Sequence, residues 1–203
     1  MVKIVADTTS SIPVSTAKEL GIYYFPQIII FGDESYRDDS EIDTQTFLHK
    51  LRISPTLPKT AAPAPALYTP VYQQLSAEGH TIIAICPSAE VSGTYRSAMI
   101  AAQDFPDADI RIIDTHTIGS GLASIVLEAT RWAEQGLDAD VIVNNVQDMI
   151  ARSRVYFVVD TLEYLYKGGR IGGAQALVGS ILQVKPILTL KDGRAEPVES
   201  QRT

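Results

Sequence analysis

The sequence predicts an α/β protein: a parallel-sheet N-terminal domain with helices on both faces, followed by part of a second α/β (α+β) domain. Two observations predict this fold. Short apolar runs alternate with segments of helical periodicity up to about residue 152, and the pattern then changes to short strands separated by glycines. The chain has 203 residues, 45% of them hydrophobic and 20% charged, which suits one large globular domain or one domain and part of another.

The first apolar run, residues 2–6, predicts a strand, and Pro13 can open the helix that follows it. A second strand is expected over residues 23–31, which are almost entirely apolar. Asp43 or Thr44 then supplies a side chain suited to capping the next helix.

Residues 81–86 and 110–113 are continuous β-branched and aliphatic runs, which is typical of buried parallel strands, and a helix is expected between them over 93–105. Five prolines predict a long loop before the first of these strands: Pro55, Pro58, Pro63, Pro65 and Pro70. A core-facing helical stripe is formed by Leu122, Ile125, Val126, Ala129, Trp132 and Ala133. Strand–helix–strand alternation indicates a parallel sheet, whose ligands bind outside the carboxyl ends of the strands.

A different pattern begins after Arg152. The elements expected there are a strand over 155–159, a glycine-rich segment over 160–173, a short helix over 174–182, and a hairpin with strands 186–190 and 194–199 joined at 191–193. Such elements make a thin core by themselves, and no closing helix follows them. We therefore divide the chain into an N-terminal α/β domain over 1–152 and an incomplete C-terminal domain over 153–203, which looks like the opening part of a second domain.

Composition excludes several classes of function. The net charge of −7 disfavours nucleic acid and anionic membrane surfaces, because the candidate basic patch contains only Arg152, Arg154, Lys167 and Arg170. The longest apolar runs are strand-sized, far below the ~20 residues that span a bilayer. Strand-forming residues begin at the N-terminus without a signal-peptide pattern, so we expect a cytoplasmic protein with no stable membrane insertion.

The segment Lys167-Gly-Gly-Arg170 places two positive charges around two flexible backbone positions. Glycines allow backbone N–H groups to approach a small anion, and Arg170 supplies a bidentate donor. No Ser or Thr follows the lysine as in a phosphate loop, and the G-x-G-x-x-G pattern is absent. The alternative is a helix stop with a glycine at its carboxyl end, followed by a tight turn.

Small polar residues follow three of the expected strands, at 7–11, 88–95 and 114–121, and the proline-rich loop adds Thr60. Hydroxyl groups and helix N-termini at the carboxyl edge of a sheet can form an anion site made of neutral donors. Ser92 is the best candidate because it occupies the expected N-cap position of a helix. The alternative is that Ser92 only caps that helix.

Catalytic and metal sites have weaker support. A serine hydrolase needs a base, and only His116 among His49, His80 and His116 follows a strand; Ser92 also lacks the G-x-S-x-G elbow. The single cysteine, Cys86, ends an apolar strand, which favours a core residue, and it excludes an internal disulfide. The acidic residues at 38–43 lack the glycine and distal glutamate of a calcium loop, so no metal site is expected.

Five segments in the same order along the chain resemble the DegV family. They are Asp7-Thr-Thr-Ser-Ser-Ile-Pro13, Val91-Ser-Gly-Thr-Tyr-Arg-Ser-Ala98, Asp114-Thr with Gly119-Ser-Gly121, Asp160-Thr-Leu-Glu-Tyr-Leu-Tyr-Lys-Gly-Gly-Arg-Ile-Gly172, and Val184-Lys-Pro-Ile-Leu188. Each motif is weak alone, whereas five collinear motifs across the whole chain are specific.

DegV proteins are two-domain fatty-acid-binding proteins. The resemblance therefore implies a bound long-chain fatty acid, with its tail in an apolar tunnel and its carboxylate near the domain junction. In bacteria with a fatty-acid kinase, family members present that carboxylate to the ATP-binding kinase subunit, which makes acyl-phosphate for phospholipid synthesis. The resemblance implies no enzymatic activity of the chain itself and no cofactor besides the bound fatty acid.

The hydroxyls that hold the carboxylate in the family fall on Thr60 and Ser92, with Gly93 and Thr94 adjacent. Arg170 matches the family arginine associated with the head-group side and with kinase docking, and we place Lys167 on that side with it. Neutral hydroxyl and N–H donors suit this role, because a carboxylate held by them stays accessible to phosphoryl transfer.

The chain departs from the family pattern in two ways. The family loop usually reads Thr-Ser-Gln-Pro, whereas this chain has Thr60-Ala-Ala-Pro63 and lacks the polar contacts of that Ser and Gln. Family members also run well beyond position 203, and a C-terminal histidine near the head group has no counterpart in this chain. Part of the tunnel wall is therefore expected to be absent, and the resemblance implies a truncated or cleaved protein; the alternative is a naturally short member of the family.

Two alternatives to a lipid carrier stay open on the sequence. One is a serine-dependent esterase or acyl transferase that uses Ser92 as nucleophile. The other is a binder of another small anion, for which affinity would not depend on acyl-chain length.

Overall fold

The computed structural model describes residues 1–177 and 185–198. Its central sheet consists of β1 (Val2–Asp7), β2 (Tyr23–Phe25), β6 (Thr81–Cys86) and β7 (Ile110–Asp114). The strands are all parallel and lie in the order β2-β1-β6-β7. The predicted parallel sheet is therefore confirmed, and its strand order places β1 and β6 in the centre.

The register of the sheet is fixed by its two-sided burial. Val5 on β1 lies opposite Tyr23 on β2 and opposite Ala84 on β6. Cys86 at the end of β6 pairs with Asp114 at the end of β7, so the carboxyl ends of these strands lie at one edge. A slip of one residue would turn every apolar side chain to the opposite face.

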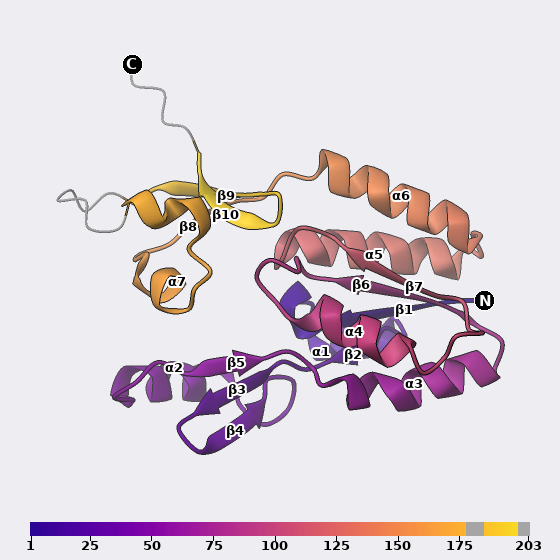
Figure 1. The fold of residues 1–203 in the computed structure, drawn as a ribbon, viewed down its shortest axis with the longest axis horizontal. Coiled ribbons are helices and arrows are strands. Elements are labelled where there is room, and N and C mark those ends of the chain that lie inside the picture. The colour runs from indigo at the N-terminus through magenta and orange to yellow at the C-terminus, as the bar shows by residue number, and fades with distance from the viewer. Residues whose placement is uncertain (178–184, 199–203) are drawn as a thin grey trace.

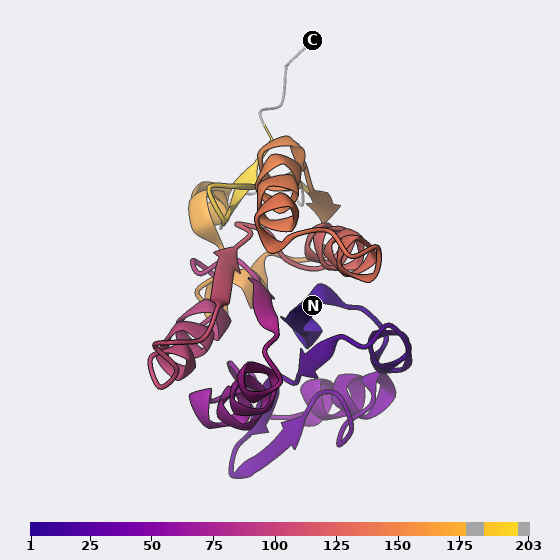
Figure 2. The ribbon, with the colours of Figure 1, turned by 90° about the vertical axis from the view of Figure 1, so that its right-hand side faces the viewer.

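Helices cover both faces of this sheet, as the end-on view in Figure 2 shows. One face packs against α1 (Val14–Glu19), α5 (Ser120–Glu134) and α6 (Ala139–Arg152), and the other against α3 (Pro65–Ala77) and α4 (Thr94–Ala102). Two cores result. The first is formed around the buried helical stripe Leu122, Ile125, Val126 and Ala129, and the second around Tyr68, Tyr72 and Leu75.

A second, antiparallel sheet of β3 (Ile28–Phe31), β4 (Glu34–Arg37) and β5 (Lys59–Ala61) extends from the first domain, in the order β4-β3-β5. It packs with α2 (Thr44–Ile53), which Asp43 caps by accepting a hydrogen bond from the Thr46 N–H at 2.7 Å. We call these elements the N-terminal flap.

The prediction of one strand over 23–31 is wrong. The run divides into β2 and β3, which belong to different sheets. Pro26 has no N–H group to donate to a ladder, and the N–H of Gln27 instead donates to Thr8 Oγ1 at 3.0 Å and to Asp38 Oδ1 at 2.9 Å. The chain therefore leaves the parallel sheet at these two residues.

The prediction of a long proline-rich loop is wrong over much of its length. Residues 59–61 form β5, and Pro65 starts α3 at a position where no N–H is needed. Pro70 lies inside the same helix.

The chain then forms a smaller C-terminal module, coloured orange to yellow in Figure 1. Its antiparallel sheet, ordered β10-β9-β8, contains β8 (Tyr156–Val158), β9 (Ile187–Lys191) and β10 (Arg194–Pro197), and α7 (Glu163–Lys167) and the 3-10 turn η2 (Gly172–Leu177) lie beside it. The predicted hairpin is confirmed. The helix expected over 174–182 is a 3-10 turn as far as Leu177, and its remainder, like residue 199 of the second hairpin strand, lies outside the described residues.

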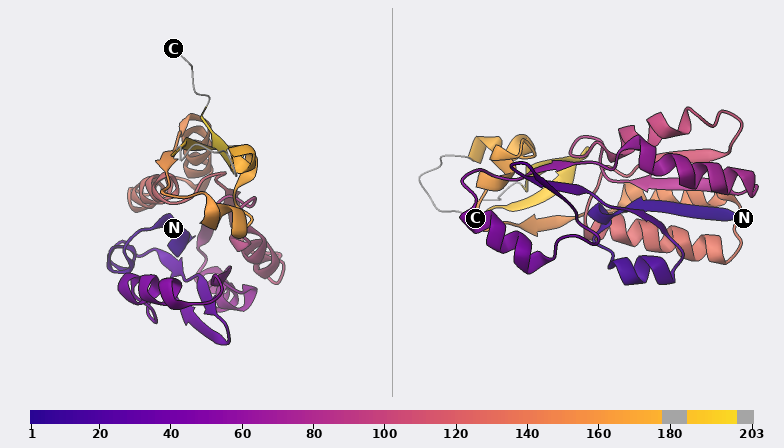
Figure 3. Two further views of the ribbon diagram at one scale, coloured as in Figure 1. Left: turned by 90° about the vertical axis from the view of Figure 1, so that its left-hand side faces the viewer. Right: turned by 90° about the horizontal axis from the view of Figure 1, so that it is seen from below.

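Both the N-terminal flap and the C-terminal module lie at the end of the sheet opposite Met1, as Figure 1 and the right panel of Figure 3 show. This is the end to which the parallel strands deliver their carboxyl termini. No helix within the described residues is long and apolar enough to cross a membrane.

Candidate functional site

A cleft of about 740 Å³ lies where the sheet edge, the N-terminal flap and the C-terminal module meet. Its polar lining consists of Thr9, Gln27, Thr60, Ser92, Ser120 and Arg170. Its apolar lining includes Ile118, Val155, Phe157, Leu165, Leu190 and Ala195. The polar group comes mostly from the flap and the sheet edge, and the apolar group mostly from the C-terminal module.

Thr60 and Ser92 reach the polar end from different elements. Thr60 lies on β5, opposite Ile29 on β3, and Ser92 lies in the loop between β6 and α4. The two segments approach closely, because a Cβ atom added to Gly93 would be 3.4 Å from the Cβ of Ala62. The structure thus brings both predicted hydroxyls and Gly93 to one cleft.

The expectation that Ser92 is the N-cap of a helix is wrong by one residue. The N-cap is Gly93, and α4 begins at Thr94. Ser92 Oγ still accepts a hydrogen bond of 3.3 Å from the Thr94 N–H, because the turn before the helix points its side chain back toward the first helical residue. The first turn of α4 contains no acidic residue, so no carboxylate from that turn competes with an anion for its N–H groups.

Thr94 lies behind the cleft lining and connects Ser92 to a buried acid. Its hydroxyl is 3.0 Å from Ser92 Oγ and donates to Asp7 Oδ2 at 2.6 Å. Thr94 is 2% exposed and Asp7 is 1% exposed. The sequence predicted that Thr94 contacts the carboxylate. In the structure its hydroxyl is buried behind the lining and contacts Ser92.

Asp7 accepts hydrogen bonds from three residues. Its Oδ1 atom accepts from the backbone N–H of Thr9 at 3.1 Å and from the Thr9 hydroxyl, and Oδ2 also accepts from Gln27 Nε2 at 2.6 Å. Burial raises the pKa of Asp7 above its usual value, although the hydrogen bonds from Thr9 and Thr94 act in the opposite direction. Asp7 and Gln27 are site residues for which sequence reasoning predicted no role. The available signal for Asp7 was its position directly after a buried strand.

Arg170 lines the cleft at its mouth. The residues before it form a complete Schellman ending of α7: the Arg170 N–H donates to the Leu165 carbonyl at 2.9 Å, and Gly169 adopts a φ of 72°. The predicted helix stop is confirmed. The same turn directs the guanidinium of Arg170 toward the loop before α4, where its Nε donates to the Val91 carbonyl at 3.2 Å. Lys167 does not line the cleft; it pairs with Glu163 at 2.5 Å on the exposed side of α7.

Among the described residues, three polar contacts join the C-terminal module to the loop that carries Ser92. Besides the Arg170 contact, Ser88 Oγ donates to the Gly193 carbonyl at 2.8 Å, and Arg194 Nε donates to Glu90 at 2.7 Å. Ser88 is fully buried, and the hairpin turn approaches it so closely that a Cβ at Gly193 would be 2.3 Å from Ser88 Oγ. The module and the hydroxyl-bearing loop are therefore in direct contact.

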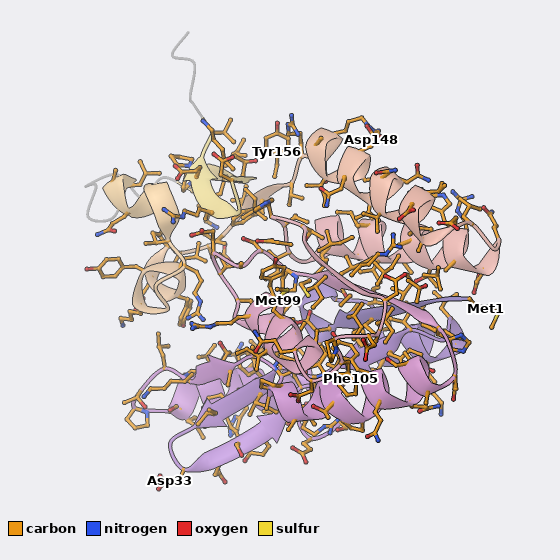
Figure 4. All side chains as sticks on the ribbon, turned by 45° about the vertical axis from the view of Figure 1, so that its right-hand side comes forward. Met1, Asp33, Met99, Phe105, Asp148 and Tyr156 are labelled. Carbon is orange, nitrogen blue, oxygen red and sulfur yellow. The ribbon has the colours of Figure 1, made fainter. Side chains whose placement is uncertain are left out.

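Figure 4 labels Tyr156 where the C-terminal module follows α6. Tyr156 lines the cleft but is 62% exposed, and its β8 neighbour Val158 is 56% exposed. Phe157, which points to the opposite face of the same strand, packs against the small core of the module and also lines the cleft.

The residues considered for catalysis lie elsewhere. No histidine is among the described residues that line the cleft. His116 Nδ1 is 3.7 Å from Asp114, His80 pairs with Glu78, and burial raises the pKa of the Cys86 thiol well above its usual value. None of the three histidines therefore lies in the lining of the cleft beside Ser92.

Acidic residues of the segment 38–43 are engaged in contacts within the protein. Asp38 accepts from Thr8 Oγ1 at 2.7 and 2.9 Å, and Asp39 pairs with Arg37 at 2.7 Å. Over residues 1–177 and 185–198, no group of three or more His, Cys, Asp or Glu side chains could hold a metal ion.

Comparison with known proteins gives consistent matches over the whole chain. A family model described as "Uncharacterised protein, DegV family" matches residues 1–203. A DegV domain-containing protein of Streptomyces coelicolor is 38% identical over 203 residues, and one of Halalkalibacterium halodurans is 34% identical over 203 residues. Each match covers 100% of this chain and 72% of the relative.

Solved structures give the same result. A DegV family protein from Thermus thermophilus, described by its fatty acid binding, superimposes with a TM-score of 0.90 at 34% identity, covering 100% of this chain and 72% of the other. DegV from Bacillus subtilis, described as a fatty acid binding protein, gives a TM-score of 0.88 at 30% identity with the same coverage. A stearic acid-binding protein from Eubacterium ventriosum gives 0.87 at 27% identity, covering 98% and 70%.

Proposed function

The chain belongs to the DegV family, and from that membership and the geometry of the cleft we propose that it binds a long-chain fatty acid. The carboxylate lies at the polar end, where Thr60 and Ser92 donate hydrogen bonds and Gly93 and Thr94 provide the N-terminus of α4. The tail lies along the apolar lining. The protein itself is a carrier and performs no chemical step.

One observation carries this proposal: a single cleft has hydroxyl groups and a helix N-terminus at one end and an apolar lining at the other. An amphipathic ligand with a small anionic head group matches both ends. Each buried CH₂ group contributes about 0.8 kcal/mol, so the tail supplies most of the affinity and the head group fixes the orientation. Arg170 is the cleft-lining cation among the described residues, and its contacts with the Val91 and Gly168 carbonyls hold it at the mouth.

We propose further that the protein presents the bound carboxylate to an ATP-binding fatty-acid kinase in the cytoplasm, which forms acyl-phosphate for phospholipid synthesis. Arg170 is exposed beside the cleft and Lys167 is exposed on α7, so both are available to a partner that approaches the head-group side. Neutral donors hold the carboxylate less tightly than a buried ion pair, which leaves it accessible to the incoming phosphoryl group.

The described residues after 152 belong, in this proposal, to a second domain that covers the tail. Their contribution of Phe157, Leu165 and Leu190 to the apolar lining supports this division, since residues 1–152 supply most of the polar lining.

Organic extraction of the purified protein followed by mass spectrometry tests the carrier function. We expect a stoichiometric long-chain fatty acid. A variant in which Leu190 is replaced by Asp, which places a charge against the tail, should carry none. Absence of lipid from the native protein after refolding with added fatty acid would overturn the proposal.

A further inference from the structure

We propose that a second cavity, which shares a wall with the cleft, binds a small free anion that carries a phosphate group, and that this anion joins the C-terminal module to the sheet domain. The cavity measures about 560 Å³ and lies between the carboxyl end of α6, the loop after β7 and the turn of the β9–β10 hairpin. We call it the junction cavity. Val155, Tyr156 and Leu190 line both the junction cavity and the cleft, and Tyr156 is labelled in Figure 4. Anion binding here is separate from fatty-acid binding and can be measured without a lipid.

Two cations from different parts of the chain line the junction cavity. Arg154 comes from the segment between α6 and β8, and Lys191 from the end of β9. Neither forms an ion pair within the part of the chain that the structure describes. By contrast, each of the module cations Lys167, Lys185 and Arg194 pairs with a carboxylate. The charges of Arg154 and Lys191 are therefore left available to a ligand.

Arg154 is held so that the edge of its guanidinium that suits an oxyanion stays free. Its Nη1 atom donates to the Ser153 carbonyl at 2.7 Å and to the Ala151 carbonyl at 2.9 Å, at the carboxyl end of α6. These two bonds use both hydrogens of Nη1 and fix the plane of the group. The N–H groups of Nε and Nη2 make no hydrogen bond to another described residue. Through this edge an arginine binds two oxygen atoms of one oxyanion at the same time.

Lys191 brings its charge from the hairpin side of the junction. It lies opposite Arg194 across the β9–β10 ladder, and two like charges opposite each other destabilise a sheet. Glu90 neutralises Arg194, whereas no carboxylate among the described residues pairs with Lys191. Asp192 is the one acidic side chain in the described lining of the cavity, so the cations outnumber it. A bound anion would relieve the remaining repulsion.

A phosphate group matches this arrangement better than a simple ion does. Its several oxygen atoms can accept from the free edge of Arg154, from Lys191 and from the Ser153 hydroxyl, which makes no hydrogen bond within the described residues. The volume of the cavity falls within the ~300–1,000 Å³ of small-molecule sites, which leaves room for the organic part of a phosphate monoester. Because Arg154 follows α6 and Lys191 belongs to the hairpin, one anion bound by both holds the hairpin against the sheet domain.

Titration calorimetry with inorganic phosphate tests the site, at neutral pH and at a constant ionic strength set with sodium chloride. We expect saturable, stoichiometric binding to the native protein. Arg154→Gln and Lys191→Gln should each weaken phosphate binding about tenfold, because each removes charge-assisted hydrogen bonds to the anion. No binding to the native protein, or native affinity in both variants, would overturn the proposal.

Arg152→Gln and Lys185→Gln are the matched controls. Arg152 is two residues from Arg154 but pairs with Asp148, and Lys185 belongs to the same module as Lys191 but pairs with Asp160. Neither lines the junction cavity. Each control removes one positive charge from the same region, and phosphate affinity should stay at the native value. An equal loss in the controls would show that net charge alone is responsible, which would overturn the site.

Asp192→Asn should change phosphate affinity in the opposite direction. The substitution removes the carboxylate that repels an anion from the cavity. Asn tolerates the φ of 50° at this turn position, so the hairpin is preserved. Tighter phosphate binding in D192N cannot come from a loss of folding, which keeps the proposal testable if R154Q or K191Q is unstable. A folded D192N protein with native or weaker phosphate affinity would contradict the proposed site.

Hydrogen exchange measures whether the anion joins the two regions. Phosphate should slow exchange in peptides from β9 of the native protein and of Lys185→Gln, but not of Lys191→Gln. An unchanged exchange rate in the native protein at saturating phosphate would overturn the joining role.

A vesicle experiment distinguishes a free anion from the phosphate of a lipid head group. Vesicles of phosphatidylcholine with added phosphatidic acid should retain no more native protein on sedimentation than vesicles of phosphatidylcholine alone. Retention that depends on phosphatidic acid and is lost in Arg154→Gln would assign the site to a lipid head group and would overturn the free anion.

Discussion

The polar end of the cleft rests on a parallel sheet with two buried cores, whereas its apolar wall belongs to a module whose buried core consists, among the described residues, of Ile171, Ala174 and Leu188. The side chains behind Ser92 are almost fully buried, while Tyr156 and Val158 on β8 are more than half exposed. The same ligand thus meets a thick, well-packed support at one end and a thin one at the other.

This difference follows from the physics of the two ends. Hydrogen bonds weaken steeply when their distances and angles change, so the hydroxyl groups need a rigid support. Apolar contact is non-directional and depends on the area that is removed from water. A thin module can therefore hold a tail, provided that it stays in contact with the sheet domain through Ser88, Glu90 and Arg170.

The largest effect is expected from removing a core side chain from each region, which tests whether the sheet domain and the C-terminal module unfold separately. Leu188→Ala should destabilise the C-terminal module by about 2–5 kcal/mol, enough to unfold it locally and to abolish lipid binding. Ile83→Ala, at a fully buried position of β6, should cost a similar amount but lower the stability of the whole sheet domain. Hydrogen exchange, read by mass spectrometry on β6 and β9 peptides, separates the two responses. Equal acceleration of β6 exchange in both variants would show that the two regions unfold as one unit.

The next largest effect on stability is expected where the hairpin turn at Gly193 contacts Ser88. Gly193→Ala combines a backbone φ of 80° with a Cβ only 2.3 Å from Ser88 Oγ, and we expect a loss of about 1–3 kcal/mol together with weaker lipid binding. Gly136→Ala is the control, because its φ is 77° and no atom lies within 4 Å of the added Cβ. Thermal unfolding measures both. If the two variants were equally destabilised and bound lipid equally well, the Ser88 contact would have no role in joining the regions.

Removing single hydroxyls should have a smaller effect, confined to binding. Ser92→Ala and Thr60→Ala should each weaken fatty-acid affinity by about 0.5–1.5 kcal/mol, since each removes one hydrogen bond to the head group. Thr60→Ser retains the hydroxyl and should bind within about twofold of the native protein. Titration calorimetry provides the affinities, and an unchanged affinity in Ser92→Ala would place the head group elsewhere in the cleft.

The smallest expected effect is a pH dependence of stability that comes from Asp7. Burial raises the pKa of Asp7 in the folded protein, so the folded state binds this proton more tightly than the unfolded chain does. Stability contributed by Asp7 should therefore fall as pH rises from the usual Asp pKa of 3.8 through the raised value. Urea unfolding should show that the stability advantage of the native protein over Asp7→Asn decreases across this window.

Asp39 should give a pH dependence of stability opposite to that of Asp7 in the same urea-unfolding experiment. The Arg37 guanidinium lowers the pKa of Asp39 below 3.8, so its stabilisation is present above that value and is lost as pH falls through the lowered pKa. The advantage of the native protein over Asp39→Asn should hence increase with pH. The same trend for both variants would contradict the assignment of Asp7 as a carboxyl group whose charge is disfavoured by burial.

The sheet domain could be predicted from sequence because its signals are local. Residues 81–86 are buried on both sides and form a continuous apolar run, and the stripe on α5 follows the helical period. The division at Pro26 and Gln27 could not be predicted in this way. It depends on the contact between the Gln27 N–H and Asp38, eleven residues away, within a run that is almost entirely apolar.

The candidate site shows the same limit. Thr60, Ser92 and Arg170 were found through motifs, and the structure brings all three to one cleft. The place of Asp7 in the site depends on its hydrogen bond from Thr94, which is 87 positions away in sequence. Lys167 shares a motif with Arg170, yet one helical turn directs it to Glu163 on the exposed side.

The most direct test of a cleft with separate head-group and tail regions is a chain-length series of saturated fatty acids, measured by calorimetry with the native protein and with Ser92→Ala. Binding free energy should become more favourable by about 0.8 kcal/mol for each added CH₂ group until the apolar lining is filled. The Ser92→Ala line should run parallel to the native one, displaced to weaker binding by a constant amount. A series without dependence on chain length, or two lines of different slope, would contradict the account.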